Sequence, residues 1–200
     1  MAPGRRSVGC RIPRRRSVSA LHPTGVRPMI FATVGTQLPF DRLLAGLDSW
    51  AAANPGVPVF AQTGPTDRAF PHLACIEQMG QAAFLARLGA ARLIVSHAGM
   101  GTILTAADLG KPVIVMPRRA KFAEHRSDHQ LATAAEMGAL DYVSVAEDGE
   151  ALHKALDCAL ASGFPTVPLA PASGADRRAP LVDCIRDFVW HRPPQRGAAA

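Results

Sequence analysis

Short apolar runs alternate with segments of helical spacing along most of the chain. The runs are rich in β-branched side chains and end at glycine, proline or polar residues, which predicts buried strands. They lie at 29–34, 57–62, 72–76, 93–96, 112–116 and 142–145. Between them, apolar residues recur at the spacing of one helix face. These helical segments are 40–53, 78–88, 102–109, 125–137, 148–161 and 179–190.

This alternation predicts an α/β fold with a doubly wound, mostly parallel, Rossmann-like sheet. We expect Phe84, Leu85 and Leu88 to face the core from the second helix. With 48% hydrophobic residues in a chain of 200, residues 29–191 suit one packed domain. A loop is predicted at 164–177 and a disordered end at 192–200.

The basic charge of the chain is concentrated in its first 28 residues. Of the 22 basic residues, 7 arginines lie in this acid-free segment, which leaves 15 basic and 16 acidic residues in the rest. The net charge of +6 therefore belongs to a tail, which argues against a nucleic-acid partner. We interpret 1–28 as a disordered tail or as an over-extended start with Met29 as the initiator, and we favour the second. A tail that binds anionic lipid is the alternative.

The cysteines bear on the compartment. Cys10, Cys75, Cys158 and Cys184 are far apart and form no Cys-x-x-Cys pair. Cys75 and Cys158 have apolar neighbours, so we expect packed thiols, a reducing cytoplasmic setting and no structural zinc. No apolar stretch approaches the length of a membrane span. We expect a cytoplasmic protein that is soluble or at most peripheral.

Glycine and polar residues follow four of the predicted strands. They are Gly35-Thr36, Gln62-Thr63-Gly64, His97-Ala98-Gly99 and Pro117-Arg118. In a doubly wound sheet, ligands bind at the carboxyl ends of the strands. These residues therefore predict a ligand site at one edge of the sheet.

The turn after residues 93–96 has the composition of an anion site. It reads His97-Ala-Gly-Met-Gly-Thr102 and leads into a helix. Glycines let a ligand approach the backbone, and free N–H groups and the helix dipole would converge on it. His97 can donate to the same anion, whereas a tight turn without a ligand is the alternative. Leu104 breaks a Gly-x-Gly-x-x-Gly motif, so a nicotinamide cofactor is not expected.

A second polar cluster follows the fifth predicted strand. It consists of Glu124, His125, Asp128, His129 and Gln130. Its histidines have the i, i+4 spacing of metal ligands, but His-Arg-Ser-Asp-His lacks the internal glutamate of His-Glu-x-x-His, and its arginine opposes a cation. A solvated helix start is a second interpretation. We favour a third, in which the cluster binds the hydroxyl groups of a ligand, with no metal.

At these residues the chain resembles the family 28 glycosyltransferases, specifically the nucleotide-sugar-binding C-terminal half of the GT-B fold. The motifs are Val34-Gly-Thr-Gln37, Gln62-Thr-Gly64, His97-Ala-Gly-Met-Gly-Thr102 with Gly110-Lys-Pro112, and His129-Gln130. The closer likeness is to split members, whose donor-binding half is a separate small protein. These include the catalytic half of the dolichol-pathway UDP-GlcNAc transferase and bacterial capsule and exopolysaccharide subunits. The length agrees, since a two-lobed GT-B enzyme needs roughly twice this chain.

The resemblance implies a role for each motif. The diphosphate of a UDP-sugar would lie against Gly35, Thr36, Gly99, Met100, Gly101 and Thr102, with His97 beside it as the catalytic residue. Sugar and ribose hydroxyls would be bound by Gln62, Glu124, His125, Asp128, His129 and Gln130. Main chain near Ile76 would hold the uracil. Where many members carry a ribose-binding glutamate, this chain has Thr105, so ribose recognition is weaker or comes from Glu124 or Asp128.

The resemblance also implies a reaction. It is inverting, metal-independent transfer of a hexosyl unit from a UDP-sugar to a lipid-linked saccharide in exopolysaccharide or capsule biosynthesis. The UDP-sugar is a substrate, so no cofactor is expected. The general base would lie on a membrane-anchored partner that binds the acceptor and holds the chain at the inner face of the cytoplasmic membrane. The alternatives are a non-catalytic nucleotide-sugar-binding regulatory subunit and a metal-dependent sugar-nucleotide epimerase or hydrolase using His125 and His129.

Overall fold

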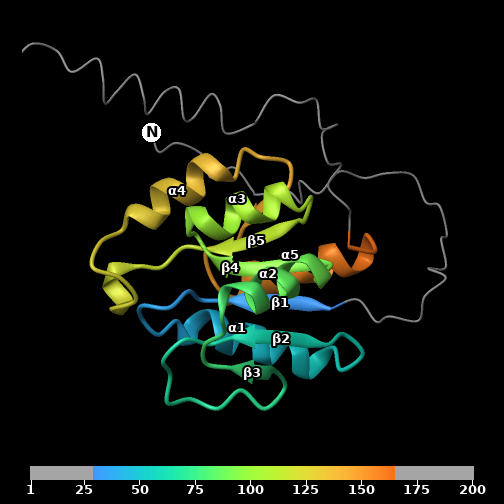
Figure 1. The fold of residues 1–200 in the computed structure, drawn as a ribbon. Helices are drawn as coiled ribbons and strands as arrows, with labels where there is room; N and C mark the ends of the chain where they lie inside the picture. Colours follow the sequence, from blue (N-terminus) through green and yellow to red (C-terminus); the bar gives the residue numbers. More distant parts are fainter. Residues whose placement is uncertain (1–28, 165–200) are drawn as a thin grey trace, which may run out of the picture. The chain divides into compact units, whose positions relative to one another are not determined.

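The computed structural model describes residues 29–164, which form a six-stranded sheet with helices on both faces (Figure 1). The strands are β1 (Ile30–Thr33), β2 (Val59–Gln62), β3 (Ala74–Ile76), β4 (Leu93–His97), β5 (Val113–Met116) and β6 (Val143–Val145). The helices are α1 (Asp41–Ala53), α2 (Gln81–Ala90), α3 (Met100–Asp108), α4 (His129–Met137) and α5 (Gly149–Ala161), with a 3-10 helix η1 (Ala120–Phe122) before α4.

The strand order across the sheet is β3-β2-β1-β4-β5-β6, and every neighbouring pair is parallel. The order reverses between β1 and β4, which is the switch point where doubly wound sheets bind ligands. Thr33 lies opposite Gln62 on one side and Ser96 on the other, so the carboxyl ends of the three central strands meet at one edge. The α/β fold class predicted from the sequence is confirmed.

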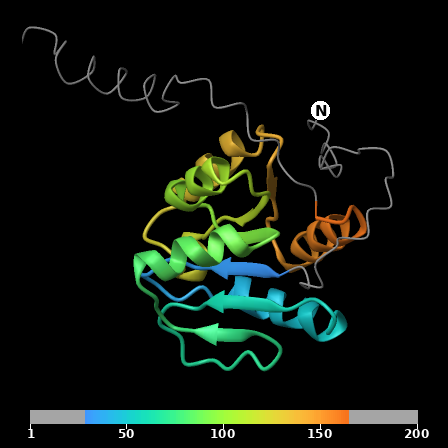
Figure 2. The same cartoon turned by 45° about the vertical axis from the view of Figure 1, so that its right-hand side comes forward.

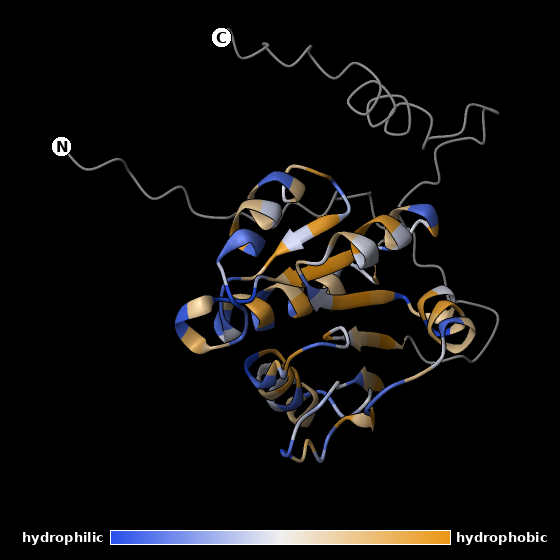
Figure 3. Cartoon of the chain, turned by 60° about the vertical axis from the view of Figure 1, so that its left-hand side comes forward, coloured by the Kyte–Doolittle hydropathy of each residue, from blue (hydrophilic) through white to orange (hydrophobic). Residues whose placement is uncertain are grey.

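Two cores cover the two faces of the sheet, because successive side chains of a strand point to opposite faces. Ile30 and Ala32 belong to the core under α1 and α5, whereas Phe31 belongs to the core under α2, α3 and α4. Figure 2 shows these two helical layers from the side. The central strands are almost uniformly apolar in Figure 3, as expected for strands that are covered on both faces.

Several local predictions are wrong. The helix expected from His125 begins only at His129, because the chain first makes the turn η1 and the Asp128 carboxylate accepts a hydrogen bond from the Ala120 amide. The helix expected from Thr102 already begins at Met100. Leu85 is 43% exposed, because α2 contacts the core through a narrow strip. The helix expected at 179–190 and most of the loop at 164–177 lie outside the described residues.

The two cysteines in the described part are not packed thiols. Cys75 lies in the edge strand β3 and is free and exposed. Cys158, in α5, is disulfide-bonded. The cysteines therefore give no support to the predicted reducing compartment. Within residues 29–164, no helix has the length and apolar character needed to cross a membrane.

Candidate functional site

His97 ends β4, and its imidazole lies between two glycines. A Cβ added at Gly35 would lie 3.0 Å from the ring Cε1, and one added at Gly99 would overlap the ring. Gly35 also has a φ of +79°, in the left-handed region that favours glycine. The sequence suggested that these glycines make room for a ligand. The structure shows that they first make room for the histidine itself.

The His97 ring is largely withdrawn from water. Its Nδ1 is buried and has no hydrogen-bond partner among the described residues. Burial, and after it the positive charge of Arg118, lowers the pKa of His97 to about 4, although the Thr33 backbone acts in the opposite direction. The ring is therefore neutral at pH 7. Because Nδ1 is enclosed by the protein, a ligand at this edge would have to be bound through the other ring nitrogen, Nε2.

Helix α3 begins directly after Gly99, and none of the described side chains caps its first turn. A helix leaves its first N–H groups without intrahelical acceptors, here those of Met100, Gly101 and Thr102. Gly101 is exposed and has open space around it, whereas Thr102 is nearly buried. Together with the helix dipole, this edge has the features of an anion site. Its binding of a diphosphate stays a prediction.

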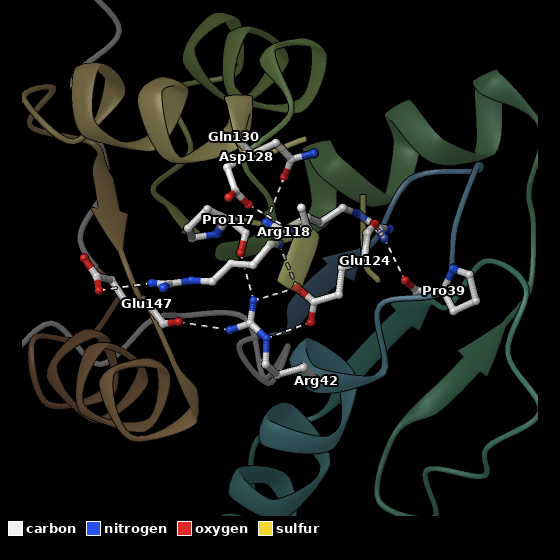
Figure 4. Close-up of polar contacts among 10 residues, drawn as sticks. Pro39, Arg42, Pro117, Arg118, Glu124, Asp128, Gln130 and Glu147 are labelled. Atoms are coloured by element: carbon white, nitrogen blue, oxygen red, sulfur yellow. Dashed lines mark hydrogen bonds and ion pairs between the residues drawn. The ribbon is translucent and has the colours of Figure 1, made fainter. Parts of the chain in front are cut away.

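Three side chains of the 124–130 cluster hold the loop that follows β5. Consecutive backbone amides donate to them, as Figure 4 shows. The bonds run from Arg118 N to Gln130 Oε1 (3.1 Å), from Arg119 N to Glu124 Oε2 (2.9 Å) and from Ala120 N to Asp128 Oδ1 (2.7 Å). The sequence assigned these three side chains to a ligand. In the structure, their oxygens accept hydrogen bonds from the backbone of the loop. The amide nitrogen of Gln130 points away from that loop in Figure 4.

Glu124 is further engaged by an ion pair. Its side chain is 7% exposed, and Arg42 binds both carboxylate oxygens, at 2.7 Å through Nε and 2.9 Å through Nη2. Arg42 also donates to the carbonyls of Pro117 (2.8 Å) and Glu147 (2.9 Å), which joins α1 to the loops after β5 and β6. Thr105 stands where many family members carry a ribose-binding glutamate. If Glu124 bound the ribose instead, its carboxylate would have to break this ion pair.

The other sequence-predicted residues also lie at this edge of the sheet. Gln62 is buried, and its Oε1 accepts a 2.8 Å hydrogen bond from Thr33. Ile76 ends β3 with an exposed side chain, and its carbonyl accepts from the Thr63 amide at 2.9 Å. Thr36 is exposed in the loop between β1 and α1. Roles for these residues toward uracil, ribose or phosphate stay predictions.

The two histidines of the cluster contact each other. The rings of His125 and His129 are 4.4 Å apart in an edge-to-face arrangement, and Ser127 Oγ lies 3.0 Å from His129 Nδ1. Desolvation first, and then the positive charges of His129, Arg118 and Arg126, lowers the pKa of His125. Among residues 29–164, no group of three or more His, Cys, Asp or Glu side chains could hold a metal ion.

The sequence places Arg118 at the binding edge of the sheet without giving it a role, and it does not point to Arg42 at all. Arg118 is 3% exposed, and Arg42 forms the ion pair with Glu124. A local signal existed for Arg118, since it directly follows a fully buried strand at the end where ligands bind. Arg42 gave no such signal, because it follows the predicted start of a helix.

The strand order, the glycine turn and the free helix start define a Rossmann-like domain with the features of an anion site at its switch point. The chain matches the glycosyltransferase family 28 C-terminal domain over residues 29–166, and it belongs to that family. A search among curated proteins gave no match.

Solved structures share the fold. The chain is similar to MurG of Acinetobacter baumannii, with 20% identity, a TM-score of 0.54, and coverage of 82% of this chain and 51% of that one. It is also similar to a glycotransferase of kitacinnamycin, with 20% identity, a TM-score of 0.52, and coverage of 76% of this chain and 41% of that one. The likeness to ALG13 has 19% identity and a TM-score of 0.50, and it covers 72% of this chain and 92% of that one. The chain thus spans about half or less of the first two, and at these identities the likeness shows the fold alone.

Proposed function

We propose that this chain is the donor-binding catalytic subunit of a split inverting glycosyltransferase. It moves a hexosyl unit from a UDP-sugar to a lipid-linked saccharide in exopolysaccharide or capsule biosynthesis. The observation that carries the proposal is the position of the His97 ring between Gly35 and Gly99 at the uncapped start of α3, in a family 28 domain. The similarity to ALG13 over 92% of that chain supports a donor-binding half that is a chain of its own.

The chemistry required of this chain is stabilisation of the leaving group. As the bond from the sugar to UDP breaks, negative charge develops on the diphosphate, where the Met100–Thr102 amides and the α3 dipole stabilise it. Because the pKa of His97 is about 4, its ring acts at pH 7 as a neutral donor and not as a cation. His129 and the Gln130 amide bind sugar hydroxyls, while main chain near Ile76 binds the uracil.

The acceptor side belongs to a partner. A membrane-anchored subunit binds the lipid-linked acceptor, supplies the general base and holds this chain at the inner face of the cytoplasmic membrane. The chain alone then binds UDP without transferring sugar, and co-expression with the partner restores transfer. UDP binding without transfer in the presence of the partner would instead favour a regulatory subunit.

The direct test is a calorimetric titration with UDP. We expect the wild type to bind, and His97→Ala to weaken binding about tenfold or more, because a hydrogen bond to a charged group is lost. His72→Ala is the control, since His72 is an exposed histidine that pairs with Asp48 at 3.2 Å. Absence of UDP heat in the wild type would remove the proposed donor site.

Gly99→Ala tests the packing of the histidine. The added Cβ would overlap the His97 ring and displace it, so UDP affinity should fall about tenfold, as for loss of the histidine itself. Gly89→Ala is the matched control, because nothing lies within 4 Å of a Cβ at that position of α2. Unchanged UDP affinity in Gly99→Ala would show that the ring position is irrelevant to binding.

A further inference from the structure

Arg118 follows β5, and its guanidinium is buried among backbone carbonyls. Nη1 donates to the carbonyl oxygens of Pro39 (2.7 Å) and Glu124 (3.0 Å). Nη2 donates to those of Val34 (2.6 Å) and Leu38 (2.7 Å). One side chain therefore satisfies four carbonyls from two segments that are far apart in the sequence.

Three of those carbonyls belong to residues 34–39, the loop between β1 and α1 that carries Gly35 and Thr36. Within residues 29–164, the bonds to Arg118 are the only hydrogen bonds that tie residues 36–39 to the rest of the chain. Gly35 adds only a long bond of 3.4 Å, from its amide to Thr33 Oγ1. The hydrogen bonding of residues 36–39 to the rest of the described chain thus depends on one guanidinium.

Arginine is suited to this place for two reasons. Its planar guanidinium presents five donors in a fixed fork, whereas the ammonium of lysine is compact and has three. The Arg118 guanidinium also lies over the Phe40 ring, with Cζ 4.6 Å from the ring centroid. The ring and the carbonyls together fix the direction of the fork.

The charge of Arg118 is not neutralised by a carboxylate of its own. Burial lowers the pKa of Arg118 to about 10, partly opposed by Glu124, so the group is charged at pH 7. The Glu124 carboxylate is bound by Arg42, and Arg118 contacts only the backbone carbonyl of Glu124. A net positive charge therefore lies close to His97, whose pKa it lowers.

We propose that Arg118 is a positioning residue for the donor diphosphate: it fixes loop 34–39 in the shape that binds phosphate and places a buried positive charge beside the site, without touching the donor. The statement about the diphosphate rests on the proposed function. The statement about the loop does not, and it is tested separately.

The loop is tested in the ligand-free protein by NMR. Amide order parameters of Gly35 and Thr36 should be about 0.85 in the wild type and below about 0.6 in Arg118→Met. Arg119→Met is the matched control, because within residues 29–164 the Arg119 side chain pairs only with the exposed Glu147, at 3.2 Å. A loop that stays rigid in Arg118→Met overturns the proposal. Global unfolding of this variant also overturns it, since Arg118 would then serve the whole fold.

Donor positioning is tested by comparing UDP with uridine, which lacks the diphosphate. In Arg118→Met, UDP affinity should fall about tenfold or more while uridine affinity is unchanged, and Arg119→Met should alter neither. Equal losses for both ligands, or no loss, overturn the proposal, as does full recovery in Arg118→Lys, which keeps the charge but not the fork. If the wild type binds neither ligand, the proposed function fails, whereas the NMR result on the loop still stands.

Discussion

Glu124→Ala is expected to destabilise the protein by about 3 kcal/mol, because it breaks a buried ion pair. The Arg42 guanidinium would lose both oxygens that it binds, and the Arg119 amide would lose its acceptor. With the Glu124 side chain 7% exposed, water reaches these donors poorly. The loss of unfolding free energy stays at the low end of the range for broken buried ion pairs. The reason is that the Arg42 side chain is 22% exposed and regains some hydration.

Urea unfolding monitored by circular dichroism measures this loss as a change in the free energy of unfolding. Glu150→Ala is the control, since its i, i+4 pair with Lys154 lies in solvent, where such pairs contribute little. A Glu124→Ala variant as stable as Glu150→Ala would refute the structural role. If that variant also bound UDP less well, Glu124 would be the ribose ligand that the sequence suggested as one option.

The fold was predictable from the sequence because its strands are short and covered on both faces. Such strands carry continuous apolar runs, as Val113–Met116 does, and glycine or polar residues mark their ends. The start of α4 was not predictable by the same rules. The segment before it has helical spacing, but Glu124 and Asp128 turn their oxygens back to the preceding loop and replace a further turn of helix.

The site was predictable in its place but not in its electrostatics. His97 was found because it ends a strand beside glycines. Its unpartnered Nδ1 and low pKa depend on packing against Gly35 and on the charge of Arg118. Arg118 itself binds carbonyls that lie 79 to 84 residues earlier in the chain, and a local pattern has no information about such partners.

Lowering the pH from 7 to 4 is expected to remove about 3 kcal/mol of stability through His97 alone. In the folded protein the pKa of His97 is about 4, against an ordinary value of 6.5. Between these values the unfolded chain binds a proton that the folded chain does not, so the free energy of unfolding falls as the pH falls. The contribution of His97 to the free energy of unfolding is fully present above the pKa that the residue has in the unfolded chain. Its loss levels off below the pKa that the residue has in the folded protein.

The contribution of His97 is isolated by urea unfolding at several pH values in the wild type and in His97→Gln. The wild type should lose about 3 kcal/mol more than the variant between pH 7 and 4. His125, whose pKa is also lowered, is present in both proteins, so its effect cancels. Parallel curves for wild type and His97→Gln would mean that the ring titrates as it does in the unfolded chain, and His97 would then enter the donor site as a cation at mildly acidic pH.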